Sequence, residues 1–412
     1  MNYKIIAMLD NQGIKRKQIK NGILLNPYFA FAFIWIFLLV IHLFNFNTKF
    51  PAATVELTVF AIFISLMSFV IGIFYQRHIE NRKDGLAVDD RPTTKLMIVS
   101  VLIFLAAVIY GRNLPLLSIL RGDTEAYQNF GITTLTPIGY CCSVTVIVIS
   151  AVKFFYGEKN KWKHIINIAI GFITFVLVYS RGLIILSGLI VVVIGASRFR
   201  FSFGSFVILI ILAIIGMLAF NAFGNIRHGY SWDNSTYLLK VAGFNEKYSY
   251  LHNISWTIVY VDTPFGNLAY NMQNEFTDYN FTGLISQLLP DMISKRVLPD
   301  YVGGIQLAVP SLTVSSMFAG GYCYFGVIGM YIQYFEMIIV TFIVTHLSKN
   351  HRMTFIAATA SMTVLLFLSF FVNTITYSGF FMPVIFMLIY GHFSLKTPQK
   401  KYAYSQEAEL NA

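Results

Sequence analysis

The chain has 412 residues, of which 56% are hydrophobic and only 12% are charged, and its formal net charge is +11. A soluble chain of this length would carry about twice this share of charged residues, so a water-soluble globular protein is excluded. The positive charge gathers in loops on one side of the predicted membrane. It therefore indicates topology, and it does not indicate a nucleic-acid partner.

Apolar runs long enough to cross a bilayer recur along the chain and predict an all-α polytopic membrane protein of about ten spans. The expected spans are 27–46, 53–75, 95–110, 135–156, 165–180, 183–196, 204–223, 312–346, 354–372 and 376–394. The first run lacks an obvious small-residue cleavage site, which predicts a retained helix and no signal peptide. The eighth run is overlong, which indicates a lead-in or re-entrant segment before a helix that begins near Tyr324.

Lys and Arg are distributed unevenly between the two sides of this topology. With both termini on one side, that side receives 21 of the 30 basic residues, so it is predicted to be cytoplasmic. The predicted organisation is a cytoplasmic N-terminal segment, spans one to seven, a large outer loop, spans eight to ten and a cytoplasmic tail. These parts cover 1–26, 27–223, 224–311, 312–394 and 395–412.

The outer loop 224–311 has 88 residues and contains 14 aromatic side chains. Leu251, Ile254, Ile258 and Val261 recur with helical spacing, and a second helical stripe over 284–293 is expected to bend at Pro290 and to lie at the membrane interface. The aromatic side chains fit an interfacial belt with a small core, or rings that stack on sugars.

Arginine is the main candidate chemistry on the predicted outer side, because its forked donors suit phosphate oxygens. The outer arginines are Arg112, Arg121, Arg181, Arg227 and Arg296. Arg181 interrupts two apolar runs in the stretch VYSRGLIIL, and the second run, 183–196, is short for a span. Such a helix hairpin would hold Arg181 below the membrane surface, where the side chain would bind an anion. Alternatively, the side chain would snorkel to the lipid headgroups.

Metal ligands are sparse. Asp89 and Asp90 form an acidic doublet in a basic inner loop, where a solvated role is expected. Asp123 and Glu125 form an outer acidic pair, as a metal-dependent glycosyltransferase of the C type would need, but that class usually carries its acids in the first outer loop, which has none here. We therefore predict no metal site and no cofactor.

Three segments around the outer loop carry a family resemblance. They are Ser180-Arg181-Gly182, Gly224-Asn225-Ile226-Arg227 and Tyr324-Phe325-Gly326-Val327-Ile328-Gly329. Their order resembles that in Wzy-type O-antigen polymerases, also called oligosaccharide repeat-unit polymerases. The resemblance extends from about span five to span eight, and the first four spans match only in hydropathy.

The resemblance implies a polymerase in the bacterial cytoplasmic (inner) membrane that joins undecaprenyl-diphosphate-linked oligosaccharides into a surface polysaccharide such as O-antigen or capsule. A chain-length regulator protein and membrane lipids are the further partners that it implies. Arg181, Arg227, Arg296 and Arg121 would bind the departing diphosphate, and no metal would be required.

A general base must deprotonate the attacking sugar hydroxyl. His252 is the first candidate because it lies on a helical face with Tyr248 and Trp256, although a structural histidine fits the position as well. Glu275 and Asp262 are the alternatives. Trp232, Trp256 and Tyr248 are the candidates for stacking on sugar rings.

Two other functions fit the same topology. An O-antigen ligase would share the arginine chemistry but transfer the glycan to a lipid core. A polysaccharide flippase or other transporter would need no large outer loop and would more often show inverted repeats or broken helices, and the sequence indicates neither.

The topology leads to a direct test. A reporter enzyme that is active only outside the cytoplasm should be active when fused after Tyr248, and inactive when fused after Lys161 or Asn350. The measurement is reporter activity at equal fusion expression. Reversed activity at any of the three positions would contradict the ten-span topology.

Overall fold

The computed structural model describes residues 22–80, 93–121, 130–157, 161–199, 231–234, 240–301 and 304–394, with isolated residues between 204 and 225. Its regular elements are helices, where η marks a 3-10 helix. They are η1 (Gly22–Leu25), α2 (Pro27–Leu43), α3 (Val55–Glu80), α4 (Thr94–Gly111), α5 (Pro115–Leu120), α6 (Leu135–Tyr156), α7 (Lys161–Leu177), α8 (Arg181–Arg198), η2 (Glu246–Ile254), α11 (Ser255–Gln273), α12 (Phe281–Leu288), α13 (Asp291–Val297), η3 (Pro299–Tyr301), α14 (Ala319–Leu347), η4 (Ser348–Asn350), α15 (Arg352–Leu368) and α16 (Ser378–Ser394).

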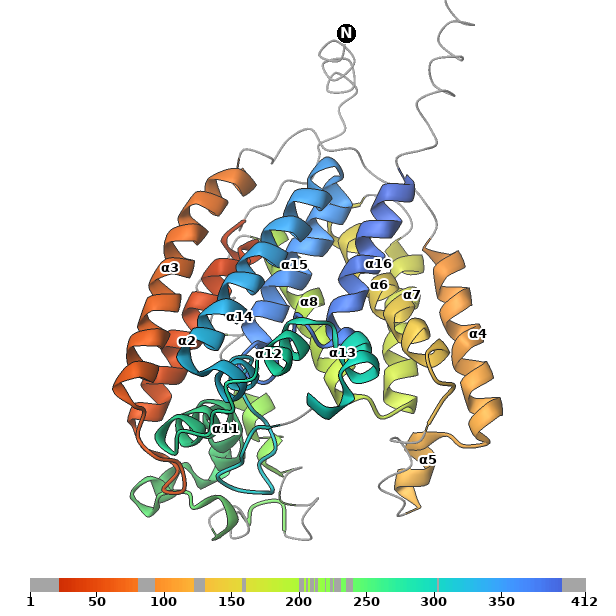
Figure 1. The fold of residues 1–412 in the computed structure, drawn as a ribbon. Helices are drawn as coiled ribbons and strands as arrows, with labels where there is room; N and C mark the ends of the chain where they lie inside the picture. Colours follow the sequence, from red (N-terminus) through yellow and green to blue (C-terminus); the bar gives the residue numbers. More distant parts are fainter. Residues whose placement is uncertain are drawn as a thin grey trace, which may run out of the picture.

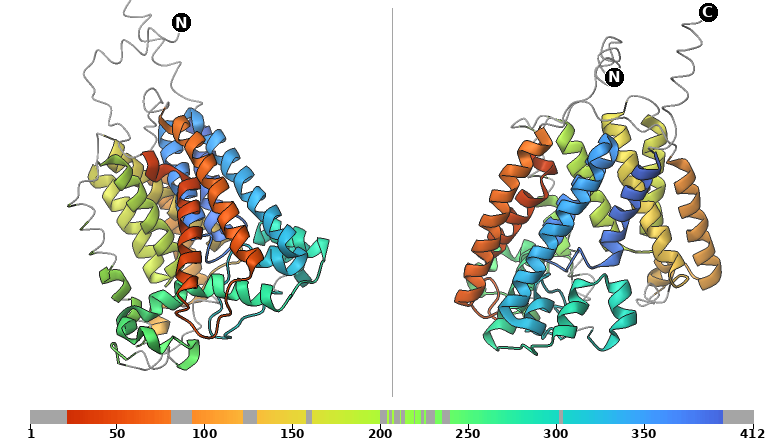
Figure 2. Two further views of the ribbon diagram at one scale, coloured as in Figure 1. Left: turned by 90° about the vertical axis from the view of Figure 1, so that its left-hand side faces the viewer. Right: turned by 45° about the horizontal axis from the view of Figure 1, so that its top comes forward.

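The long helices form a bundle in which helices alternate in direction from α2 to α8 and again from α14 to α16 (Figure 1). Helices α2, α4, α7 and α15 run toward the end of the bundle that also carries α5, α11, α12 and α13, and α3, α6, α8, α14 and α16 run away from it (Figures 1 and 2). We call this end the α13 end. Its helices lie across the bundle, so they cover the termini of several long helices at once.

Five of the described helices, α3, α4, α6, α8 and α14, are long and apolar enough to cross a membrane, so the chain is a helical membrane protein. Helices α2, α15 and α16 coincide with expected spans but contain shorter apolar stretches. The expected span 204–223 falls mostly outside the described residues. The expectation that 183–196 is a short helix is wrong, because α8 has 18 residues and begins at Arg181 itself.

Five described residues from the two predicted sets of loop charges lie at opposite ends of the bundle. Lys161 at the start of α7, Arg198 at the end of α8 and Lys349 after α14 share the end opposite α13. Arg181 at the start of α8 and Arg296 in α13 belong to the α13 end. The orientation relative to the membrane stays a prediction.

Helix α15 lies in the middle of the bundle, and residues 353–366 are all buried. Its hydroxyl side chains are satisfied within the helix: Thr359, Ser361 and Thr363 each donate to the carbonyl four residues earlier, at 2.6, 2.8 and 2.8 Å. An unpaired hydroxyl in an apolar interior would cost free energy, so these local bonds let a polar sequence occupy the core.

Helix α14 is broken near its start, so the expectation of no broken helix is wrong. Phe325 and Gly326 have non-helical backbone angles, and the φ of 62° at Gly326 is one that a residue with a side chain rarely adopts. The seven residues before Ala319 are not helical. The expected lead-in segment before Tyr324 is thus present as a non-helical stretch followed by a short helical piece, and the long helix begins after the break.

The backbone groups that the break exposes are paired within the protein. The carbonyl of Cys323 accepts from the Asp278 N–H, and that of Tyr324 accepts from the Asn280 N–H, both at 2.8 Å. Before the break, the Gly321 N–H of the short helical piece donates to the side chain of Gln333 in the long helix at 3.0 Å. Irregular backbone at membrane depth requires such partners, because lipid supplies none.

Two asparagines of α11 hold the segment that leads to α14. Asn267 donates to the carbonyls of Leu312 and Val314, at 3.0 and 2.8 Å, and accepts from the Ala308 N–H. Asn271 exchanges hydrogen bonds with the backbone of Gln306 in both directions, at 2.7 and 3.0 Å. Side chains four residues apart share one helix face, so α11 presents a continuous polar edge to this segment.

The break in α14 gives a stability prediction. A methyl group on Gly329 would clash with the carbonyl oxygen of Gly321, because the short helical piece and the long helix touch there. Gly329→Ala should therefore destabilise the protein by about 1–3 kcal/mol, as overpacking does. The measurement is the thermal unfolding temperature of purified protein.

The matched control is Gly188→Ala in α8, where a methyl group meets no atom within 4 Å. It should leave the unfolding temperature unchanged or raise it slightly, since alanine favours a helix interior. Equal effects of the two substitutions would contradict the close packing at the break.

Candidate functional site

Arg181 begins α8 at the α13 end, where its side chain is exposed. Its Nη2 donates to the hydroxyl of Tyr179 at 2.8 Å, and the guanidinium carbon lies 4.6 Å from the centroid of the same ring. Tyr179 has a φ of 62°, which is uncommon for a residue with a side chain. Among the described residues, no carboxylate forms an ion pair with Arg181.

Arg296 is the second arginine with a defined partner. It lies in α13, and its Nη2 donates to the hydroxyl of Thr134 at 3.3 Å. Thr134 directly precedes α6 and has a φ of 71° and a ψ of −45°. A β-branched residue with positive φ is strained, and such strain is concentrated at functional sites. In the described part of the chain, Arg296 also has no ion-pair partner.

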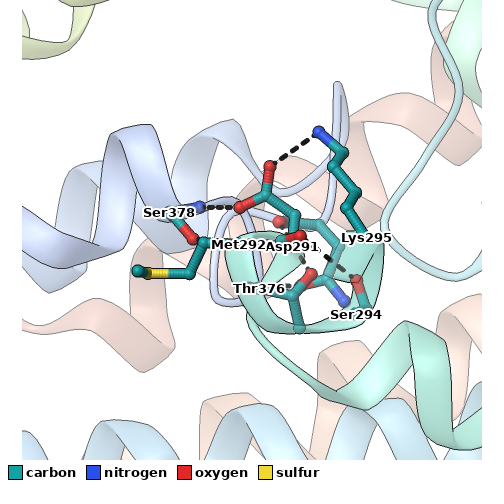
Figure 3. A network of polar contacts seen from close by, with 7 residues as sticks. Asp291, Met292, Ser294, Lys295, Thr376 and Ser378 are labelled. Carbon is teal, nitrogen blue, oxygen red and sulfur yellow. Dashed lines mark hydrogen bonds and ion pairs between the residues drawn. The ribbon is translucent and has the colours of Figure 1, made fainter. Parts of the chain in front are cut away.

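Helix α13 is tied to the start of α16 by a compact set of hydrogen bonds (Figure 3). One carboxylate oxygen of Asp291 accepts from the Ser378 N–H at 2.8 Å, and the other accepts from Lys295 at 3.0 Å. The Asp291 N–H donates to the Thr376 carbonyl at 2.8 Å. The carboxylate of Asp291 thus caps α16 and fixes the position from which Arg296 extends.

The charge state of Asp291 follows from these contacts. Its partial burial raises the pKa of the carboxyl group, but the hydrogen bonds from Ser378 and the ion pair with Lys295 outweigh burial and hold the pKa below its ordinary value. The negative charge of Asp291 is therefore balanced by Lys295 and by the Ser378 N–H. Asp291 forms no ion pair with Arg181 or Arg296.

Three long helices begin side by side at this position. Arg296 contacts the residue before α6, Asp291 caps α16, and a methyl group on Gly182 of α8 would lie 3.5 Å from the ring of Phe380 in α16. Helix N-termini carry partial positive charge. The starts of α6 and α8, together with Arg181 and Arg296, form the candidate anion site, whereas the Asp291 carboxylate already occupies the start of α16.

The other predicted diphosphate residues are less informative. Arg121 is exposed at the end of α5, which also belongs to the α13 end. Arg227 lies outside the described residues. The candidate site therefore rests on Arg181 and Arg296, whereas Thr134 and Tyr179, which hold them, carry no sequence signal that would have identified them.

The two catalytic candidates are far apart. His252 lies in η2 just before α11, and Glu275 lies in the turn just after it. Helix α11 has 19 residues, so it separates them by about 28 Å. Both side chains are exposed, and His252 Nδ1 lies 3.1 Å from the carbonyl oxygen of Ser249, which makes Nε2 the nitrogen able to accept a proton. They cannot act on one hydroxyl group together.

Asp262 is unsuited to act as the base. Its carboxylate is buried and lies 2.8 Å from Nδ1 of His42, whose Nε2 lies 3.0 Å from the carbonyl oxygen of Pro51. The pair joins the last turn of α2 to the middle of α11. The carboxylate of Asp262 is thus paired with His42 and is closed to solvent, and this partner was not identified from the sequence.

The three predicted stacking residues separate into two groups. Trp256 is 3% exposed and donates through Nε1 to Asn225 at 2.7 Å, and Tyr248 is buried and donates to the Phe44 carbonyl at 2.7 Å. Both belong to an aromatic core with Phe46 and Phe244, so their rings have no free face for a sugar. Trp232 is 65% exposed, so its ring keeps a face that a sugar could contact.

Within the described residues, no three His, Cys, Asp or Glu side chains form a cluster that could hold a metal ion. Asp123 and Glu125, the outer acidic pair, lie outside those residues, as do Asp89 and Asp90. The donors that the described part of the candidate site offers are guanidinium groups and helix N-termini.

Comparison with known proteins gives no relative: the chain matches no protein-family model, no curated protein and no solved structure.

The Asp291 network predicts a pH-dependent stability. Because the pKa of Asp291 is lowered in the folded protein, its ionised form stabilises the fold above the ordinary Asp pKa of about 3.9, and this contribution is lost as pH falls through the lowered value. Asp291→Asn should therefore lower the unfolding temperature at neutral pH, and the difference from the unmodified protein should shrink below about pH 4.

Asp300→Asn serves as the control, since Asp300 is exposed in the neighbouring η3. It should leave the unfolding temperature close to that of the unmodified protein at every pH. A difference for Asp291→Asn that persists unchanged at low pH would show that the carboxylate charge does not hold α13 to α16.

Proposed function

We propose that the protein is a polysaccharide polymerase that joins polyprenyl-diphosphate-linked oligosaccharides on the outer face of a bacterial cytoplasmic membrane. The observation that carries the proposal is the pair Arg181 and Arg296. Both lie at the α13 end, each is held by a strained residue, and neither has a carboxylate partner among the described residues. Guanidinium groups kept from carboxylates are suited to an incoming phosphate group.

The chemistry fits a site that has no access to nucleotide sugars. The bond between the anomeric carbon of the growing chain and the diphosphate oxygen breaks, and the diphosphate leaves with the electron pair and its lipid carrier. The acceptor hydroxyl oxygen bonds to the anomeric carbon and loses its proton to a base. In this reaction Arg181, Arg296, Arg227 and Arg121 stabilise the charge that develops on the leaving group.

One base suffices for this step, and the length of α11 allows only one of the two exposed candidates to reach a given hydroxyl group. His252 remains our first choice because its side chain is exposed and its Nδ1 lies 3.1 Å from the Ser249 carbonyl oxygen, which orients the ring. Trp232, whose ring is exposed, is the remaining candidate for contact with a sugar.

The function is tested with purified protein and a lipid-linked repeat unit as the sole substrate. A ladder of polymer is the expected product. A single transfer that requires a lipid A acceptor would identify a ligase instead, and the absence of any transfer, with movement of the lipid across a vesicle membrane, would identify a transporter.

Arg181 and Arg227 give the sharpest mutational test. Lysine keeps the charge but loses the planar fork, so Arg181→Lys and Arg227→Lys should fail almost as badly as the alanine variants. Loss of one donor to the leaving group should lower turnover on the order of 100-fold or more. The measurement is the rate of polymer formation at matched expression.

Arg112→Lys is the matched control, since Arg112 is an exposed arginine that follows α4 at the α13 end. It should form polymer at the normal rate. Normal polymer from both lysine variants of Arg181 and Arg227 would remove these arginines from the mechanism and support snorkelling to headgroups.

A further inference from the structure

A groove of about 440 Å³ lies between α4 and α7, at the end of the bundle opposite α13. Its walls are mostly apolar side chains: Met97, Ile98, Val101, Leu102, Ile166 and Ile170. Helix α4 is the least buried of the candidate spans, with only 17% of its residues buried inside the protein. The groove therefore opens on the face of the bundle that meets lipid.

The groove has the length of one membrane leaflet. It extends along α4 from Thr94 to Leu102 and along α7 from Lys163 to Ile170, which corresponds to about 12 Å of helix. Half of the hydrocarbon core of a bilayer measures about 15 Å. A chain that enters at the helix starts would thus end near the middle of the membrane.

Two polar side chains besides Lys163 line the groove: the buried hydroxyl of Thr94 has no hydrogen-bond partner among the described residues, whereas Asn167 has partners. Asn167 is buried and donates to Thr93 at 3.1 Å and to Ser150 at 3.5 Å. These bonds join α4, α6 and α7 beneath the groove. The charged group that remains at the mouth is Lys163, whose side chain lines the groove in the first turn of α7.

The described helix starts beside the groove are basic. Lys95 and Lys161 lie in the same first turns of α4 and α7, and neither first turn contains an acidic residue. Trp162 beside them is 78% exposed, as expected of a side chain at the headgroup level. Basic pockets between membrane helices are typical sites for anionic lipid headgroups.

We propose that this groove binds an anionic phospholipid, with one acyl chain along the apolar walls of α4 and α7 and the phosphate at Lys163. The site is separate from the candidate anion site, which lies at the other end of the bundle, and the proposal does not depend on the polymerase activity. The bound lipid would cover part of the surface of α4 that the protein leaves exposed.

The test is native mass spectrometry of the full-length protein in detergent, with phosphatidylglycerol and phosphatidylcholine of identical acyl chains. The protein should retain phosphatidylglycerol in preference, and Lys163→Gln should weaken its binding roughly fivefold, as expected for one basic residue. Lys163→Arg should retain it. Val101→Phe, which fills the groove, should weaken the binding of both lipids.

Lys349→Gln is the control, because Lys349 lies at the same end of the bundle but does not line the groove. It should bind phosphatidylglycerol as the unmodified protein does, and an unchanged unfolding temperature shows that each variant is folded. Equal affinity for the two lipids, or equal effects of Lys163→Gln and Lys349→Gln, would overturn the proposal. Preferential binding of a polyprenyl phosphate that is lost in Lys163→Gln would also overturn it, since the occupant would then be the carrier lipid.

Discussion

Lipid offers no hydrogen-bond partners, and this constraint explains the parts of the structure that depart from plain helices. Where α14 breaks at Phe325 and Gly326, the freed carbonyls are met by the backbone of 278–280, and the chain before α14 is met by the asparagines of α11. The helices at the α13 end are thus fixed to the bundle by the polar groups that the break and the lead-in segment expose.

The same packing determines where the arginines lie. Helix α13 follows α12 after the turn at Pro290, and Asp291 at its first position caps α16. Arg296, one turn further along, therefore reaches the start of α6. Because Asp291 sets the orientation of α13 before any ligand binds, less conformational entropy is lost when Arg296 contacts a ligand.

The sequence was sufficient for the membrane class, for most of the helices and for the bend at Pro290, since hydropathy and proline act locally. It could not predict the true length of α8, because Arg181 and Gly182 were taken to interrupt the helix that in fact begins with them. Nor could it predict that Trp256 is buried or that Asp262 pairs with His42, a residue 220 positions away. Such pairs depend on how distant helices pack, which periodicity does not contain.

The distance along the chain between partners has a consequence for biosynthesis. Helix α2 is made before α11 and α15, so His42 finds its partner only when Asp262 has been made, and Trp35 donates to Ser369, which lies 334 residues later. Helix α2 must therefore remain in the membrane with unpaired polar groups until these later segments are translated. Long-range contacts of this kind form late and leave intermediates exposed. Truncation of α15 and α16 would thus impair α2, a helix near the other end of the described chain.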